Sequence, residues 1–316
     1  MTLIHRVLKI LADGQRHSGV ALAERLGVTR AAISKAVAGL SEVPVAVDRK
    51  GYSLARAFWP LDRERIQGLL AEAGFWPEQL TILEEVDSTN RFLLEAEAVG
   101  LSVCLAERQT AGRGRRGRSW QATPYGNLMV SVSTTLQDMP DPLGVLSLGA
   151  GVAVHRALRG LGIADCALKW PNDVLWQARK LAGILIEMRG EPEAMRIVIG
   201  VGLNGTVGPQ AASAIDQPWV DLHALLPVVD RDQVAAAVIA ELMRVMDEYR
   251  QGRGALLLSE WRAHHAYVGL RVSVATGREP PYVGTVQDVN AEGALVVQGA
   301  GGTKVMRSGE VSVRPL

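Results

Sequence analysis

The chain has 316 residues, of which 48% are hydrophobic and 21% are charged, and its formal net charge is +1. This apolar content excludes a disordered chain, because such a chain lacks the hydrophobic surface that offsets the entropy lost on ordering. The balanced charge excludes a uniformly basic protein that coats nucleic acid. The length predicts two or three domains.

The composition does not point to a membrane, a secreted scaffold or a metal site. Cys104 and Cys166 have neither metal-site nor redox-motif spacing, and two cysteines are too few for a disulfide framework. The longest charge-free apolar stretch, 142–154, is shorter than the ~20 residues that span a bilayer. Arg6 and Lys9 interrupt the apolar N-terminal run, which argues against a signal peptide. We therefore expect a cytoplasmic protein with no membrane partner and no metal site.

Charge divides the chain near its N-terminus. Residues 1–60 carry nine Lys or Arg against four Asp or Glu, whereas residues 61–104 carry nine acids against three arginines. A basic stretch of domain-minimum size followed by an acidic one predicts a small N-terminal domain, 1–60, with a partner of its own.

Capping residues and helical spacing predict three helices in this domain. Asp13-Gly14 ends the first, Ser18 caps the second, Gly27 ends it, and Thr29 caps the third. Two short helices joined by a tight turn that contains glycine form the helix-turn-helix pattern of DNA-binding domains.

A β-hairpin follows the third helix and would form a wing. Its strands are predicted at 43–47 and 52–54, with Arg49 and Lys50 in the turn. The predicted DNA contacts are Thr29, Arg30, Ser34, Lys35, Arg49 and Lys50. The alternative is a three-helix packing domain with an ordinary solvated basic face. We favour DNA binding because the cap, the turn and the basic residues coincide.

Strands and helices then alternate through the middle of the chain. Strands are predicted at 81–86, 103–107, 127–136 and 196–203, and long helices at 143–161 and 234–249. Strand 127–136 alternates cleanly, so we expect it to bury one side only. The polar turn Asp87–Asn90 is expected to cap a helix that begins near Arg91.

The segment Gly112–Gly117 matches the dinucleotide fingerprint G-x-G-x-x-G, but this match is rejected. The fingerprint requires glycines that open a helix facing a pyrophosphate, whereas Pro124 and Gly126 here lead directly into a strand. Four arginines between 113 and 118 fit a mobile glycine-rich loop that brings guanidinium groups to a polyphosphate. The alternative is a solvated basic loop that touches nucleic acid.

Four motifs together carry a family resemblance. They are Gly112-Arg-Gly-Arg-Arg-Gly-Arg-Ser-Trp120, Lys169-Trp-Pro-Asn-Asp173, Lys180-Leu-Ala-Gly-Ile-Leu-Ile-Glu187 and Gly200-Val-Gly-Leu-Asn204. In this order and approximate spacing, the chain resembles the biotin protein ligases, and its N-terminal domain extends the resemblance to the bifunctional ligase and biotin operon repressor. The resemblance runs from about Leu3 to Arg314.

The resemblance implies an α/β (α+β) multidomain fold. Its parts are an N-terminal winged helix-turn-helix at 1–60, a central mixed-sheet catalytic domain at 61–268 and a C-terminal SH3-like small β-barrel at 269–316. Short strand candidates at 272–275, 282–289, 294–298 and 311–313 agree with the barrel.

The resemblance also implies site residues. The biotin-binding residues fall on Ser88, Thr89, Asn90, Gln109, Arg113, Gly114, Arg115 and Lys180, and the ATP- or adenylate-binding residues on Arg118, Trp120, Asn172 and Asn204. We expect Lys180, Arg115 and Asp173 to carry the catalysis and the strands near Gly183 and Gly202 to provide an apolar slot for biotin. We expect His264 and His265 to be surface or packing residues.

The implied reaction has two steps. Biotin and ATP, accompanied by Mg²⁺, form biotinyl-5′-adenylate and pyrophosphate through positioning and charge neutralisation. A lysine of a biotin carboxyl carrier domain then attacks the mixed anhydride, with Asp173 orienting or deprotonating the amine. Operator DNA would be a further partner, bound by a homodimer that forms when the adenylate is bound.

Two alternatives remain at this point. One is a transcription regulator that senses biotin or its adenylate without ligating it, although Lys180, Asp173 and the arginine loop argue against a pure sensor. The other is a ligase whose N-terminal domain no longer binds DNA. A lipoate ligase is not expected to carry this arginine-loop sequence.

Overall fold

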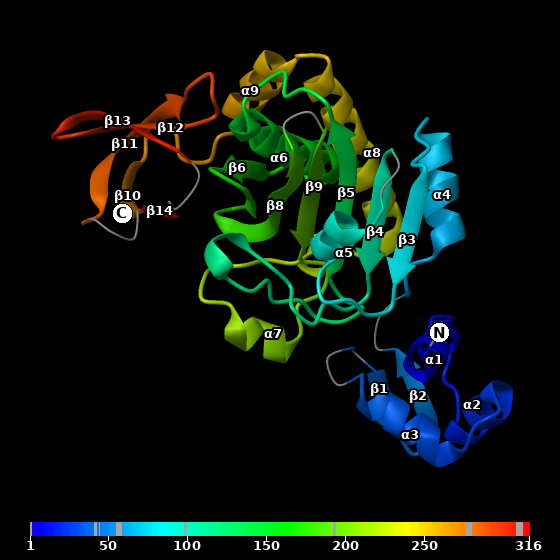
Figure 1. Ribbon diagram of the computed structural model, residues 1–316. Helices are drawn as coiled ribbons and strands as arrows, with labels where there is room; N and C mark the ends of the chain where they lie inside the picture. Colours follow the sequence, from blue (N-terminus) through cyan, green and yellow to red (C-terminus); the bar gives the residue numbers. More distant parts are fainter. Residues whose placement is uncertain are drawn as a thin grey trace.

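The computed structural model describes residues 2–40, 43, 45–54, 59–97, 100–191, 194–275, 280–307 and 312–316. Pro44, within the first predicted wing strand, and Val311, within the last predicted strand, lie outside the described residues. Figure 1 shows the N-terminal part, a large central part and the C-terminal strands in succession. No helix in the described ranges has the length and apolar character needed to cross a membrane.

The N-terminal unit consists of three helices and a hairpin. Its elements are α1 (Leu3–Leu11), α2 (Gly19–Leu26), α3 (Arg30–Ala38), β1 (Val45–Asp48) and β2 (Gly51–Leu54). The predicted caps are confirmed, because the Ser18 side chain accepts from the backbone of Ala21, that of Thr29 accepts from Ala32, and Gly27 ends α2 with a φ of +66°.

The core of this unit includes one side chain from elsewhere in the chain. Tyr125, from the loop before the central strand β5 (Leu128–Leu136), is 7% exposed and belongs to the same buried cluster as Val7, Leu8 and Ile33. Its φ of +59° is a left-handed conformation that is strained for a bulky side chain. Burial of the ring in the N-terminal cluster gives a physical reason for holding that conformation.

The central unit is built on a seven-stranded mixed sheet. Its spatial order is β3 (Gln79–Leu83), β4 (Ser102–Ala106), β5, β9 (Ala194–Leu203), β8 (Arg179–Glu191), β7 (Asp173–Trp176) and β6 (Cys166–Lys169). Only β3 and β4 pair in parallel, and the other neighbours are antiparallel. The accompanying helices are α4 (Arg63–Glu72), α5 (Thr89–Glu95), α6 (Leu143–Gly160), α7 (Pro209–Ala214), α8 (Arg231–Arg250) and α9 (Gly254–Ala263).

The expectation that β5 buries only one side was wrong. Eight of its nine residues are buried, because α6 and α8 lie over one face of the sheet and α5 lies over the other (Figure 1). Val130 and Val132 enter the main hydrophobic core, and Ser131 points to the opposite side, where it hydrogen-bonds Thr89 and Asn90 of α5. The polar half of the alternation therefore contacts an internal polar surface instead of solvent.

The C-terminal unit is a five-stranded antiparallel sheet. Its order is β13 (Gly302–Met306), β12 (Leu295–Gly299), β11 (Tyr282–Val289), β10 (Arg271–Ala275) and β14 (Ser312–Pro315). Strand β13 was not among the strands predicted from the sequence. Buried Val272, Val286 and Val297 continue the hydrophobic core of the central unit, so this sheet packs on the larger unit.

A buried ion pair joins several segments of the central unit. Glu107, which follows β4 and is fully buried, accepts from Arg231 at 2.7 Å and from the backbone of Leu61 at 2.6 Å. Arg231, at the start of α8, also donates to the carbonyls of Trp59 and Asn127. One pair thus fixes the chain that enters the central unit, the end of β4, the start of β5 and the start of α8.

Arg231→Met should lower the free energy of unfolding by about 3–5 kcal/mol, because it leaves the Glu107 carboxylate buried without its charge partner. Urea-induced unfolding followed by circular dichroism measures this. Arg108→Met is the matched control, since Arg108 pairs with Glu85 and both side chains are more than half exposed, and it should cost at most about 1 kcal/mol. Equal losses in the two variants would contradict the assigned importance of the buried pair.

Three histidines are packed beside the edge strand β6. Burial and the nearby charge of His264 lower the pKa of His155 to about 4, and burial lowers the pKa of His265 to about 4. The His155 and His264 rings are 4.0 Å apart, and His265 lies 4.3 Å from Trp261. The backbone of this segment pairs with Leu168 of β6. His264 and His265 therefore serve packing, as expected.

Stability should fall as the pH drops from about 6.5 towards 4, because the unfolded chain takes up protons that folded His155 refuses. Between pH 7 and pH 5, His155 alone should account for a loss of about 2 kcal/mol in the free energy of unfolding. His155→Phe should flatten that dependence, as measured by urea unfolding at both pH values. An unchanged pH slope in the variant would refute the assignment.

Candidate functional site

One pocket of about 470 Å³ lies where the central sheet, the arginine loop and the C-terminal unit meet. It is lined by the start of α5, the loop after β4, the β6–β7 connection, strands β8 and β9, the segment 214–219 and strand β14. Residues distant in the sequence thus face a common volume large enough for a small organic ligand.

The pocket brings together every residue that the sequence analysis predicted for small-molecule binding or catalysis. They are Ser88, Thr89, Asn90, Gln109, Arg113, Gly114, Arg115, Arg118, Trp120, Asn172, Asp173, Lys180 and Asn204. Their individual roles stay predictions.

The polar side of the pocket is pre-arranged around the start of α5. Ser88 caps this helix, and both the backbone N–H and the hydroxyl of Thr89 donate to Oε1 of Gln109, at 2.8 and 3.1 Å. With its Oε1 occupied, the Gln109 side chain presents its amide N–H groups to a ligand. Asn90 is different, because Ser131 donates to its Oδ1 and its Nδ2 donates to Leu185 and Glu187.

The apolar floor depends on glycines in β8 and β9. A Cβ atom on Gly202 would lie 2.4 Å from the Trp120 ring, and one on Gly183 would lie 3.0 Å from it. The glycines therefore let the Trp120 ring approach the sheet. The buried indole N–H of Trp120 has no hydrogen-bond partner within the described part of the chain, so it can donate to a ligand.

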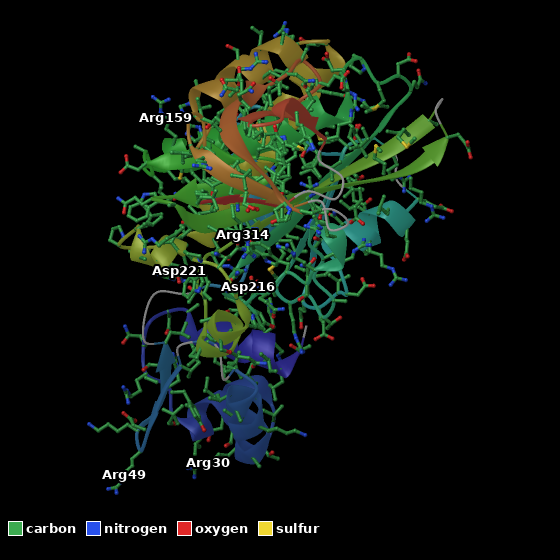
Figure 2. All side chains as sticks on the ribbon, turned by 90° about the vertical axis from the view of Figure 1, so that its left-hand side faces the viewer. Arg30, Arg49, Arg159, Asp216, Asp221 and Arg314 are labelled. Carbon is green, nitrogen blue, oxygen red and sulfur yellow. The ribbon has the colours of Figure 1, made fainter. Side chains whose placement is uncertain are left out.

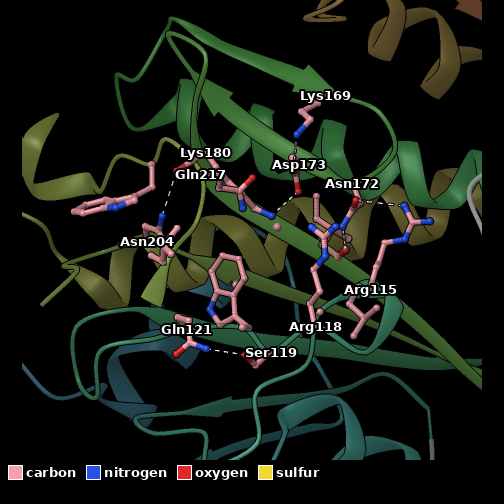
Figure 3. A pocket seen from close by; sticks show the side chains of 18 of the residues that line it. Arg115, Arg118, Ser119, Gln121, Lys169, Asn172, Asp173, Lys180, Asn204 and Gln217 are labelled. Atoms are coloured by element: carbon pink, nitrogen blue, oxygen red, sulfur yellow. Dashed lines mark hydrogen bonds and ion pairs between the residues drawn. The ribbon is translucent and has the colours of Figure 1, made fainter. Parts of the chain in front are cut away.

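A buried carboxylate holds two ammonium groups at the centre of the pocket. Lys180 Nζ lies 2.6 Å from Asp173 Oδ1, and Lys169 Nζ lies 3.2 Å from Oδ2 (Figure 3). Burial alone would raise the pKa of Asp173, but the charges of Lys180 and Lys169 outweigh it and hold the pKa below its ordinary value. Asp173 is thus an anion that positions cations and a weak proton acceptor.

The arginine loop adds positive charge opposite these lysines. Arg115 Nη1 donates to Asn172 Oδ1 at 3.3 Å, and Asn172 Nδ2 donates to the carbonyl of Ile184 (Figure 3). Burial and the neighbouring Arg116 charge lower the pKa of Arg115, and the Asp173 charge opposes them. An anionic ligand between the arginine loop and Lys180 would offset the cost of assembling these cations.

The segment after α7 is attached to the lysine-bearing strand. The backbone N–H of Lys180 donates to Pro218, and that of Val220 donates to Lys180. Asn204 Nδ2 reinforces this attachment by donating to the carbonyls of Lys180 and Val220. The Asn204 side chain therefore holds this segment against β8.

Several lining residues were missed by the sequence analysis. Lys169 is the first residue of the Lys169–Asp173 motif, and its i, i+4 spacing from Asp173 could have identified it as a partner of that carboxylate. Trp219, Tyr267 and Arg314 also line the pocket, but neither motif nor periodicity distinguishes them. The described residues hold no group of three or more His, Cys, Asp or Glu side chains that could bind a metal ion.

The predicted DNA contacts lie on a separate surface. Thr29, Arg30, Ser34 and Lys35 are exposed on or just before α3, and Arg49 and Lys50 are exposed in the turn between β1 and β2. Figure 2 shows Arg30 and Arg49 at the end of the molecule remote from Arg314. The basic surface is thus presented away from the pocket.

Comparisons with known proteins find similarity to biotin ligases in most of the segments that form this pocket. Residues 82–204 match the Biotin/lipoate A/B protein ligase family, and residues 268–314 match the Biotin protein ligase C terminal domain. The Bifunctional ligase/repressor BirA of Escherichia coli is 36% identical over 98% of this chain and 96% of its own. The Biotin--[acetyl-CoA-carboxylase] ligase of Mycobacterium tuberculosis is 36% identical over 80% of this chain and 95% of its own.

A solved structure extends the similarity to the fold. The biotin protein ligase of Aquifex aeolicus in complex with biotin and ATP aligns over 76% of this chain and 100% of its own, with a TM-score of 0.65 and 26% identity. The chain belongs to the biotin protein ligase family, and it is similar to the bifunctional ligase/repressors over nearly its whole length.

Proposed function

We propose that this protein is an ATP-dependent biotin protein ligase of the cytoplasm that also acts as a biotin-responsive transcriptional repressor. The observation that carries the ligase activity is the single pocket in which Asp173 and Lys180 face the arginine loop. The Aquifex ligase, which binds biotin and ATP, aligns with the greater part of this chain over its full length.

In the first step, a carboxylate oxygen of biotin attacks the α-phosphorus of ATP, and pyrophosphate leaves. Lys180, held by Asp173, draws the two negative reactants together, and Arg115 and Arg118 stabilise the charge on the phosphates. Mg²⁺ accompanies the triphosphate as its counter-ion. The Asp173 carboxylate already pairs with two lysines, so it has no need of a third cation.

Biotin lies along the polar side of the pocket and the glycine floor. Its ureido ring hydrogen-bonds Ser88, Thr89, Gln109 and the backbone near Gly114. Its apolar part packs on the surface beside Gly183 and Gly202. Trp120 covers the adenine, and Asn172 and Asn204 hold the pocket wall on the nucleotide side.

In the second step, the neutral amine of a carrier-domain lysine attacks the biotinyl carbonyl. The new amide bond forms, AMP leaves and the amine loses a proton. Because its pKa is lowered, Asp173 is a weak base: it orients the neutral amine by accepting a hydrogen bond from it, and it leaves the proton to solvent or to the departing phosphate.

The N-terminal unit supports the repressor activity. Its three capped helices and basic hairpin suit a winged helix-turn-helix that spans 1–60, with the exposed residues of α3 and Arg49 and Lys50 touching operator DNA. The catalytic domain spans 61–268, and the C-terminal sheet is an SH3-like barrel at 269–316. The E. coli ligase/repressor aligns over 98% of this chain and so includes most of the N-terminal unit.

Incubation of the protein with ATP, biotin and a biotin carboxyl carrier domain tests the ligase activity. Mass spectrometry should find biotin on one carrier lysine and, without carrier, biotinyl-adenylate. Adenylate binding without any transfer would favour the sensing regulator that does not ligate.

Lys180→Gln should reduce adenylate formation by at least about 10²-fold, since removing an electrostatic stabiliser of this kind costs that much. Transfer from chemically made biotinyl-adenylate should fall less, because the carboxylate–phosphate repulsion has already been overcome. Single-turnover assays of each step measure the difference. Equal losses in the two steps would make Lys180 a structural residue.

Operator binding should depend on the ligand. One copy of the small basic unit binds DNA weakly and with strong salt dependence, so specific repression needs a dimer that reads a two-fold operator. Biotinyl-adenylate should promote dimerisation and operator binding, and by linkage operator DNA should tighten adenylate binding by the same factor. Sedimentation and DNA titration without ligand, with biotin and with biotinyl-adenylate measure this. Equal behaviour in all three states leaves a ligase with a passive N-terminal unit.

A further inference from the structure

Glu187, near the middle of β8, contacts two parts of the pocket wall at once. Its Oε1 lies 3.0 Å from Nη1 of Arg113 in the arginine loop, and its Oε2 accepts from Nδ2 of Asn90 in α5 at 2.9 Å. The Glu187 side chain is 23% exposed and that of Arg113 is 40% exposed. One carboxylate on a strand thus connects the loop with the helix on the other side of the pocket.

The Asn90 end of this connection is rigid. Asn90 Nδ2 also donates to the Leu185 carbonyl, and Ser131 donates to Asn90 Oδ1 at 2.6 Å. A Cβ atom on Gly200 would lie 2.1 Å from that oxygen, so the Asn90 amide is seated against the sheet. These contacts occupy both amide protons and the carbonyl of Asn90, which makes it a support behind the pocket instead of a ligand donor.

The Arg113 end lies at the base of a small hairpin. The backbone of Trp120 donates to Gly112, and that of Gly114 donates to Arg118, so the two arms of the loop are tied together. The tip is the 3-10 turn Arg115–Gly117, and the returning arm carries Trp120 onto the glycine floor. An attachment at Arg113 therefore sets the position of the whole hairpin.

We propose that Glu187 is a positioning residue that fastens the arginine loop to β8 through Arg113 and thereby holds the loop over the bound adenylate. Strand β8 pairs with β9 from Ala182 to Glu191, and this pairing includes Glu187, so the strand is a fixed base for the attachment. The Arg113 side chain then holds the loop against β8, and the side chains of Arg115 and Arg118 bind the phosphates. This assignment rests on the proposed ligase function.

The test removes the negative charge of the Glu187 side chain and keeps its size and shape. Glu187→Gln should release biotinyl-adenylate about tenfold faster, the scale expected when a charge-assisted contact is weakened. The KM for biotin should rise, while kcat for transfer at saturating adenylate stays within about twofold, since the reacting groups are untouched. Arg113→Gln should behave alike, and the double variant should lose no more than the worse single variant.

Glu191→Gln is the matched control, because Glu191 lies four residues further along β8 and is exposed. It should leave adenylate release unchanged. Additive losses in the double variant, or adenylate release at the wild-type rate in Glu187→Gln, would overturn the proposal.

A second measurement does not need catalysis. The loop carries Arg113, Arg115, Arg116 and Arg118, so trypsin should cut the ligand-free Glu187→Gln protein there at least about threefold faster than the wild type, because opening of the loop exposes these sites. If the wild-type protein makes no adenylate, the proposed function fails, and the trypsin result still decides whether Glu187 holds the loop. Equal cleavage rates would reject the attachment.

Discussion

The central unit depends on the buried ion pair between Glu107 and Arg231, which holds its entering chain, β4, β5 and α8 together. Both side chains are almost inaccessible, and they hydrogen-bond two backbone segments, 59–61 and Asn127 just before β5. An ion pair in such a place requires nearly complete hydrogen bonding, since each unpaired charge would be very costly. The pair therefore specifies one arrangement of these segments. Asn127, at its edge, donates to Asn204 in the pocket wall.

The same region connects the N-terminal unit with the pocket. Tyr125 is buried in the N-terminal core, and its backbone N–H donates to the Glu107 carbonyl. Thr123, two residues earlier, accepts from the backbone of Gly208 at the start of α7. A short loop thus touches the N-terminal unit on one side and the segment bordering the pocket on the other, which gives the proposed ligand response a physical route.

The pocket combines two demands that conflict in an ordinary core. Phosphate chemistry needs a concentration of positive charge, and the apolar part of biotin needs a tight, dry surface. Lys169 and Lys180 are tolerated because both pair with buried Asp173. The dry surface is available because Gly183 and Gly202 let Trp120 lie on the strands. The glycines and the carboxylate are thus as necessary as the residues expected to touch the ligands.

Most of the local structure and thirteen of the pocket's lining residues could be predicted from the sequence. Caps such as Ser18 and Thr29 and the glycine after α2 act within a few residues, so their signals survive without tertiary information. The four motifs were readable because each places its chemistry in one continuous segment. Which groups meet depends on the folded chain. The 2.6 Å contact between Asp173 and Lys180 joins two strands, and Glu187 joins its strand to a loop and to a helix. The packing of the folded chain also covers β5 on both faces and places Tyr125 in a core formed by residues more than 60 positions away. Burial on a given face depends on what packs against it, and no local pattern contains that partner.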